Sequence, residues 1–165
     1  MLETMGRTVF LSVAALLMAV SCVSCGGGER ESLFSRSQTV DPNGWRKDEV
    51  LDFEVPVNDT ASVFAFMVNL RNRTDYAYKN LYLFVNVKAP DGREMCDTLN
   101  YALAYDSGEW TGAGGMFSKY RENTFYYRNN IVFPMLGTYT VSFRHGMREE
   151  SLNGIASVGL ILKHS

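Results

Sequence analysis

The sequence predicts an all-β protein, a single antiparallel β-sandwich of about seven to eight strands behind an N-terminal lipoprotein signal peptide. Three observations support this prediction. From residue 48 onward, apolar and polar side chains alternate with a period of two in several short segments, which is typical of half-buried strands. Turn signals separate these segments, and no convincing long helix lies between them. Aromatic residues make up 13% of the chain, and aromatic side chains favour β-structure.

Residues 1–21 have the composition of a secretory signal peptide. Arg7 precedes an apolar run, residues 9–20, which is too short to span a bilayer hydrocarbon core of about 30 Å. A small residue and then Cys22 follow, which is typical of a lipobox, where the cysteine is acylated and becomes the mature N-terminus. We therefore expect Cys22 to carry diacylglycerol and fatty acyl chains, with Cys25 as the alternative lipidation site, and we expect no other cofactor.

Residues 22–47 form the predicted lipidated N-terminus and flexible tether. Glycine, serine and alternating charges dominate this stretch, and it shows no apolar period. Stable anchoring takes more than one acyl chain, because each buried methylene contributes only about 0.8 kcal/mol. We expect anchoring to a membrane of the cell envelope, with the outer membrane favoured and the domain in the periplasm or at the cell surface.

The β-sandwich domain is expected over residues 48–165. Pro56 predicts that the first strand lies at an edge or ends there, because proline cannot donate to a ladder. Asp91 and Gly92 form a turn that leads into a strand over residues 93–103. The other predicted strands cover residues 51–57, 64–70, 81–87, 126–133, 139–143 and 157–163.

Two parts of this domain are less regular. Residues 106–115 are rich in glycine and predict an irregular loop. Residues 145–155 are mixed, and their apolar residues are compatible with one short helical turn. Cys96 is expected to be a small buried apolar residue.

Composition and motifs disfavour several functions. The formal net charge is −2 and no basic stripe stands out, so we expect no nucleic-acid partner. The two histidines and three cysteines lack the spacing of a metal site. His145 lies in a charged run that predicts a solvated loop, and no paired carboxylates or nucleophile motif is recognisable. We therefore predict no metal site, no catalytic residues and no enzyme.

A run of local patterns, in order along the chain, is similar to one known family. The Cys22 lipobox comes first, and the stretch that spans residues 75–83 is the most specific part. The further matching segments are residues 44–48, 68–72, 90–92, 97–104, 108–112 and 158–160. Over nearly the whole mature domain, the chain resembles the gliding-motility lipoprotein family GldH of Bacteroidetes.

This resemblance implies a membrane-anchored lipoprotein needed for gliding and associated with cell-surface motility and type IX secretion machinery. It implies no enzyme and supplies no catalytic residues. The expected partners are the membrane, through the lipid, and other envelope motility or secretion proteins. The alternative hypothesis is a surface glycan-binding β-sandwich lipoprotein.

Aromatic residues are the candidates for partner binding. Alternation turns Tyr82 and Phe84 away from the core, where exposed rings mark a partner surface or a sugar platform unless a loop near residues 110–120 covers them. A tryptophan in a polar turn either plugs the end of a sandwich or anchors a partner. The full set of candidates is Tyr76, Tyr78, Tyr82, Phe84, Trp110 and Trp45.

Overall fold

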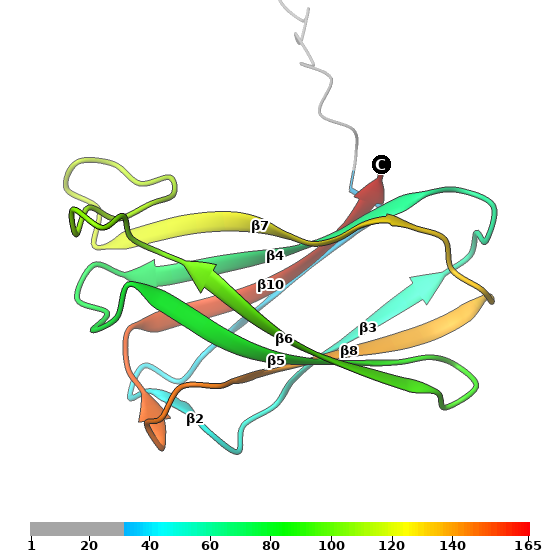
Figure 1. The fold of residues 1–165 in the computed structure, drawn as a ribbon, viewed down its shortest axis with the longest axis horizontal. Coiled ribbons are helices and arrows are strands. Elements are labelled where there is room, and N and C mark those ends of the chain that lie inside the picture. The colour runs from blue at the N-terminus through cyan, green and yellow to red at the C-terminus, as the bar shows by residue number, and fades with distance from the viewer. Residues whose placement is uncertain (1–31) are drawn as a thin grey trace, which may run out of the picture.

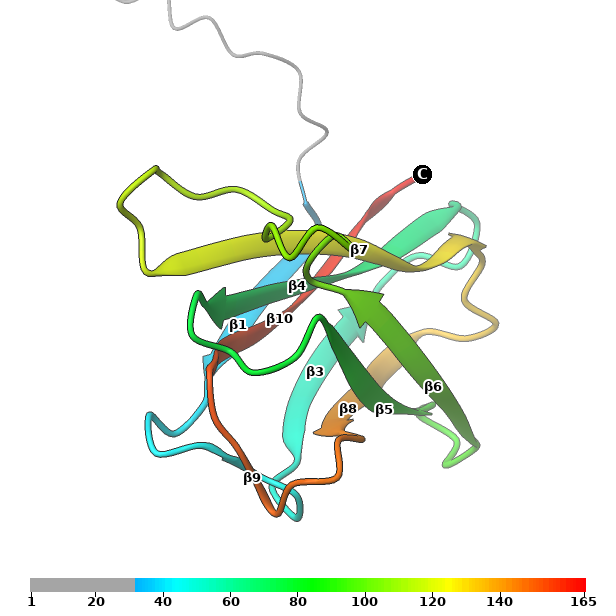
Figure 2. The same ribbon diagram turned by 60° about the vertical axis from the view of Figure 1, so that its left-hand side comes forward.

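Two antiparallel sheets pack face to face, and a third, two-stranded sheet closes one end (Figure 1; Figure 2). This computed structural model describes residues 32–165. The predicted signal peptide and both candidate lipidation cysteines, Cys22 and Cys25, lie outside the described residues. The described part of the chain contains no helix, and hence none long and apolar enough to cross a membrane.

The strand order defines the two layers. The first sheet, named the β1 sheet, has the order β1-β10-β4-β7, and the second, the β3 sheet, has the order β3-β8-β5-β6. The small sheet pairs β2 with β9. The strands are β1 (Phe34–Thr39), β2 (Trp45–Arg46), β3 (Leu51–Val57), β4 (Phe64–Arg73), β5 (Asn80–Lys88), β6 (Glu94–Ala102), β7 (Tyr120–Ile131), β8 (Gly137–His145), β9 (Ser151–Leu152) and β10 (Ile155–His164).

The core lies between the two sheets and follows from the period of two. In β3, every second residue from Leu51 to Val57 is buried, while Asp52, Glu54 and Pro56 face solvent. Pro56 lies in an edge strand of the β3 sheet, as its missing donor requires. The all-β fold predicted from the sequence is therefore confirmed.

Side chains join the two sheets where β6 and β7 form one open side of the sandwich. The Tyr101 and Phe125 rings stack with centroids 4.5 Å apart. Nearby, the Tyr127 hydroxyl and the Arg128 guanidinium both donate to Asp97 Oδ2, at 2.6 and 2.8 Å. These contacts hold together two edge strands that share no backbone ladder.

The sheets begin earlier than the sequence predicted. Strand β1 pairs in antiparallel register with β10, although its residues were expected to belong to the tether over residues 22–47. The reason lies in its position at the edge of the β1 sheet, where most of its side chains face solvent. A strand with so little burial shows no apolar alternation in its sequence.

Two further expectations are wrong. Residues 145–155 form no helical turn, since Ser151 and Leu152 belong to β9 and a tight turn at Gly154, with φ of +92°, leads into β10. Cys96 is exposed, because it lies on the outward-facing side of β6 and pairs with Asn86 across the outer face. The alternation of β6 turns Asp97, Leu99 and Tyr101 inward instead.

Candidate interaction surface

The outer face of the β3 sheet carries two exposed aromatic rings from β5. Leu81 and Leu83 fill the core, so that Tyr82 and Phe84 point outward, each with 41% of its surface exposed. Phe84 faces Arg144 of β8 in the ladder, and the guanidinium carbon lies 5.7 Å from the ring centroid. We name Tyr82, Phe84 and Arg144 the β5 patch.

A glycine makes room for the two rings. Gly146 follows β8, and its backbone N–H donates to the Tyr82 carbonyl at 2.7 Å. A Cβ atom at this position would lie 3.1 Å from a Phe84 ring carbon and 3.2 Å from the Tyr82 Cβ. A side chain at this position would require the Phe84 ring and the Tyr82 Cβ to shift by a few tenths of an ångström, so Gly146 is part of the geometry of the β5 patch.

Hollows flank the β5 patch on two sides. A hollow of about 320 Å³ lies along the outer face, where Phe84 and Arg144 meet Val50, Asn86 and Cys96. A larger hollow of about 640 Å³ lies between the patch and the end of β2, where Arg46 is followed by Lys47 and Asp48 in a turn. The patch is therefore a ridge of aromatic and cationic side chains between two depressions.

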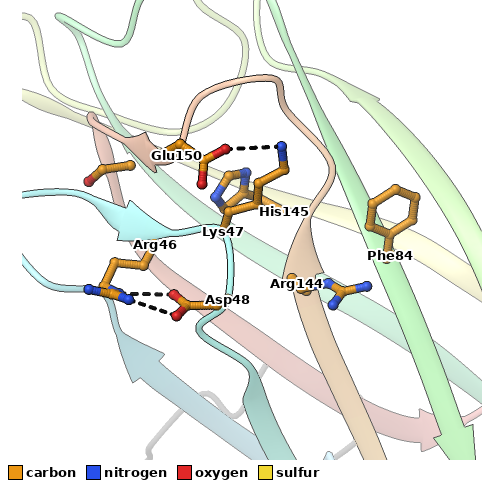
Figure 3. Close-up of a pocket in the computed structure, with 8 residues that line it drawn as sticks. Arg46, Lys47, Asp48, Phe84, Arg144, His145 and Glu150 are labelled. Carbon is orange, nitrogen blue, oxygen red and sulfur yellow. Dashed lines mark hydrogen bonds and ion pairs between the residues drawn. The ribbon is translucent and has the colours of Figure 1, made fainter.

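Charged side chains line the larger hollow (Figure 3). Arg46 pairs with Asp48 at 2.6 Å, and Lys47 pairs with Glu150 at 3.5 Å. Figure 3 shows both ion pairs on the opposite side of the hollow from the Phe84 ring. Arg144 forms no ion pair with a carboxylate of the described residues, so its charge is available to a partner.

His145 also lines this hollow, but its side chain is fully buried. Neither ring nitrogen forms a hydrogen bond of ordinary geometry, although the Trp45 backbone lies close enough to affect the ring, and the Trp45 and His145 ring centroids lie 5.4 Å apart in an edge-on contact. Burial lowers the pKa of the His145 ring, and the backbone of Trp45 opposes only part of this effect.

The prediction of a solvated position is therefore wrong for His145, which ends β8, whereas Arg148 and Glu150 of the same charged run are exposed in the loop that follows. The inward alternation of Tyr139, Val141 and Phe143, continued by one step, would have placed His145 in the core.

The six aromatic candidates from the sequence separate into an exposed pair and a packed group. Tyr76 is buried, and its hydroxyl donates to the Asn80 carbonyl at 3.0 Å. The centroid of its ring lies 5.7 Å from that of Tyr78 and 6.4 Å from that of the half-buried Trp110. Of the six candidates, only Tyr82 and Phe84 lie in the β5 patch.

Tyr78 and Trp45 have structural partners of their own. The Tyr78 hydroxyl donates to a Glu149 carboxylate oxygen, which raises the pKa of Tyr78 and lowers that of Glu149. Trp45 is fully buried, and its indole N–H donates to the Glu49 carbonyl at 3.1 Å. Trp45 therefore plugs the end of the sandwich beneath the small sheet, and its ring offers no surface to a partner.

The described residues can be compared with the side chains that metal sites, general bases and protein interfaces require. Among residues 32–165, no group of three or more His, Cys, Asp or Glu side chains is placed to hold a metal ion. The buried His145 has no hydrogen-bonded carboxylate to orient it as a general base. The β5 patch combines aromatic rings with arginine, the residue types enriched where proteins bind one another.

Comparison with known proteins places the chain among relatives of nearly equal length. It is 30% identical over 165 residues to a protein named gliding motility lipoprotein GldH homolog from Christiangramia forsetii, with 96% of each chain covered. It is 33% identical over 151 residues to the gliding motility lipoprotein GldH of Flavobacterium johnsoniae, covering 87% of this chain and 90% of the relative.

Solved structures add little. A family GH115 4-O-methyl-alpha-glucuronidase with specificity for decorated arabinogalactans superposes with a TM-score of 0.43 at 8% identity. The match covers 83% of this chain but 18% of that enzyme, and a likeness of this quality supports no conclusion about function.

The sequence comparison identifies the family, because the model of the family described as GldH lipoprotein matches residues 32–162. The chain belongs to the GldH lipoprotein family.

Proposed function

We propose that this protein is a lipid-anchored, non-catalytic component of the gliding-motility machinery of the cell envelope, associated with type IX secretion. In this proposal the acylated N-terminus holds the β-sandwich at a membrane, and the β5 patch docks a protein partner of that machinery. The relatives named as gliding motility lipoproteins support a role in gliding motility. The lipobox at Cys22, with Cys25 as the alternative, supports a lipid anchor at the N-terminus.

The observation that carries the contact mechanism is the β5 patch. Two aromatic rings project from a strand of the sheet. Because aromatic side chains have few rotatable bonds, these rings lose little side-chain entropy when a partner covers them. The unpaired Arg144 beside Phe84 supplies a charge that would become valuable once water is excluded. Hot spots of binding typically have this composition, a cluster of Tyr or Phe with Arg surrounded by polar side chains.

The test replaces both rings of the β5 patch. The double variant Y82S/F84S should fold normally, because both side chains lie on the surface, and should no longer retain its partner after mild detergent extraction. The matched control is Tyr105→Ser, since Tyr105 is exposed in a loop outside the patch. A gene-deletion strain complemented with Y82S/F84S should lose motility, whereas the control should restore it.

Two results would contradict the proposal. One is recovery of the protein alone from detergent, with motility and secretion intact in the deletion strain. The other is a response of the β5 patch to sugars: exposed rings also form glycan platforms, so binding on a glycan array that Y82S/F84S abolishes would favour the glycan-binding alternative.

A further inference from the structure

Two apolar side chains project into solvent at a loop tip far along the chain from the β5 patch. Met116 and Phe117 are 89% and 94% exposed, the highest values among the large apolar residues of the described chain. They occupy the two central positions of a turn closed by a hydrogen bond from the Ser118 N–H to the Gly115 carbonyl at 2.9 Å. We name this feature the 115–118 turn.

The rest of the loop holds this turn in place. Arg121 Nη1 donates to the carbonyls of Gly115, Ser118 and Tyr120 at 3.1–3.3 Å. Gly114 makes this approach possible, because a Cβ atom there would lie 2.5 Å from the same nitrogen. The carbonyls at the base of the tip thus accept hydrogen bonds within the protein, which lowers the cost of moving the tip out of water.

The outer face of β7 carries two aromatic rings paired with cations, Tyr120 beside the turn and Tyr126 further along the strand. Arg71 lies 4.3 Å from the ring centroid of Tyr120, and Lys163 lies 5.7 Å from that of Tyr126. Tyrosine, lysine and arginine are the side chains that suit a membrane–water interface, since each combines an apolar body with a polar end. The acidic residue of this face, Glu122, accepts a hydrogen bond from Asn69 at 3.0 Å.

The 115–118 turn and the start of β1 lie at opposite ends of the β1 sheet but along the same edge of the molecule. Tyr120 pairs with Arg73 at the end of β4, whereas Phe34 pairs with Leu162, whose partner Phe66 lies near the beginning of β4. Figures 1 and 2 are related by a rotation about the vertical axis, and in both the β7 loop, the start of β1 and the C-terminus form the upper edge.

Cys22 precedes Ser32 by ten residues and Cys25 precedes it by seven. A chain of this length spans at most about 35 Å, so a lipidated cysteine would hold the β1 sheet, which the chain enters first, near the bilayer.

We propose that Met116 and Phe117 insert into the interface of the same bilayer that holds the lipidated N-terminus, with Arg71 and Lys163 facing its headgroups. This inference rests on the lipid anchor of the proposed function. The 115–118 turn is a second point of contact, and together with the acyl chains it fixes the orientation of the sandwich. The outer face of the β1 sheet then faces the lipid, and the β5 patch on the opposite sheet points away from it.

The experiment uses the full lipidated chain reconstituted in vesicles of phosphatidylethanolamine and phosphatidylglycerol with brominated acyl chains. Phe117→Trp places a reporter at the tip, and Phe84→Trp is the matched control on the opposite sheet. Wild-type protein supplies the background from Trp45 and Trp110. We expect the added emission of F117W to shift to the blue and to be quenched by bromine, and that of F84W to do neither.

Flotation separates the two hypotheses. If the chain does not float with the vesicles, the lipid anchor of the proposed function has failed, and this inference fails with it. If the chain floats and F117W emits like F84W, the anchor stands and the inference is overturned. A second combination of results would also overturn the inference: M116D/F117D loses a protein partner, and the emission of F117W is not quenched. The 115–118 turn would then be assigned to a pocket of that protein.

Discussion

The buried His145 ring packs against Trp45, and neither ring nitrogen forms a hydrogen bond of ordinary geometry. An unsatisfied buried polar group costs about 1–3 kcal/mol of stability. Burial disfavours the protonated ring, so the pKa in the folded state lies below that of the unfolded chain. The same side chain therefore makes the fold sensitive to mild acid.

Replacing His145 by phenylalanine should remove this sensitivity. Below about pH 6.5 the unfolded chain binds a proton that the folded protein rejects, so stability falls as the pH drops, by at most about 1.4 kcal/mol per pH unit. His145→Phe should flatten this dependence between about pH 8 and 5.5 and leave stability equal or higher by about 1 kcal/mol. Urea unfolding followed by Trp fluorescence measures both quantities.

The other histidine supplies the control for this prediction. His164 is exposed at the end of β10, and His164→Gln removes a histidine while leaving the buried His145 ring in place. An unchanged slope in His145→Phe would show that the buried ring does not cause it.

Cys96 should react with a maleimide in the folded protein, because its side chain lies on the outer face of β6. Cys96→Ser should change the free energy of unfolding by less than about 0.5 kcal/mol, as is usual for a surface substitution. Peptide mapping of labelled, folded protein checks the reaction. Labelling that requires denaturant would instead indicate a buried thiol.

At the scale of elements, Asp97 of β6 connects the two sheets through Tyr127 and Arg128 of β7. The hydrogen bond from Tyr127, followed by that from Arg128, lowers the pKa of Asp97. A carboxyl whose pKa is lowered by folding stabilises the protein above its unfolded pKa, about 3.9. This contribution is lost as the pH falls through the lower folded value.

Asp97→Asn should therefore destabilise the protein at neutral pH by about 1–2 kcal/mol, since it weakens two hydrogen bonds to a charged acceptor. The difference from the wild type should shrink below about pH 4, where the wild-type carboxyl also becomes neutral. Asp75→Asn is the control, because Asp75 forms an exposed pair with Arg73, and such pairs contribute little. Equal effects of both substitutions on urea unfolding would contradict a bridging role for Asp97.

The elements that the sequence predicts are those with one buried and one exposed face. The alternation in β3, β5 and β8 is visible because each strand contributes every second side chain to the core. Strand β1 lacks this signal, since backbone pairing with β10 holds it at an edge with little burial. The pair β2–β9 is too short for any periodicity, and the burial of Trp45 depends on that pairing.

The same reasoning explains which parts of the candidate surface were predictable. Alternation in β5 predicts that Tyr82 and Phe84 point outward, and the structure agrees. It cannot predict that Arg144 lies beside Phe84, because this proximity depends on the register between β5 and β8. The exposure of Met116 and Phe117 was also missed, since a glycine-rich loop carries no periodic pattern.

On the scale of the whole molecule, the two outer faces carry different chemistry. The β1 sheet presents the 115–118 turn and the rings of Tyr120 and Tyr126, each paired with a cation. The β3 sheet presents the β5 patch and its hollows. A small sandwich with its two faces divided in this way is suited to hold a partner at a fixed distance from a membrane.

Site-specific photo-cross-linking in living cells tests this account most directly. A benzophenone amino acid at Phe84 should give discrete protein adducts, and the same group at the exposed Tyr105 should give none. The account predicts that Arg144→Glu abolishes the adducts formed at position 84 while the amount of protein in the envelope stays unchanged. Absence of adducts at position 84, or identical adducts at positions 84 and 105, would contradict the claim that the β5 patch is the working surface.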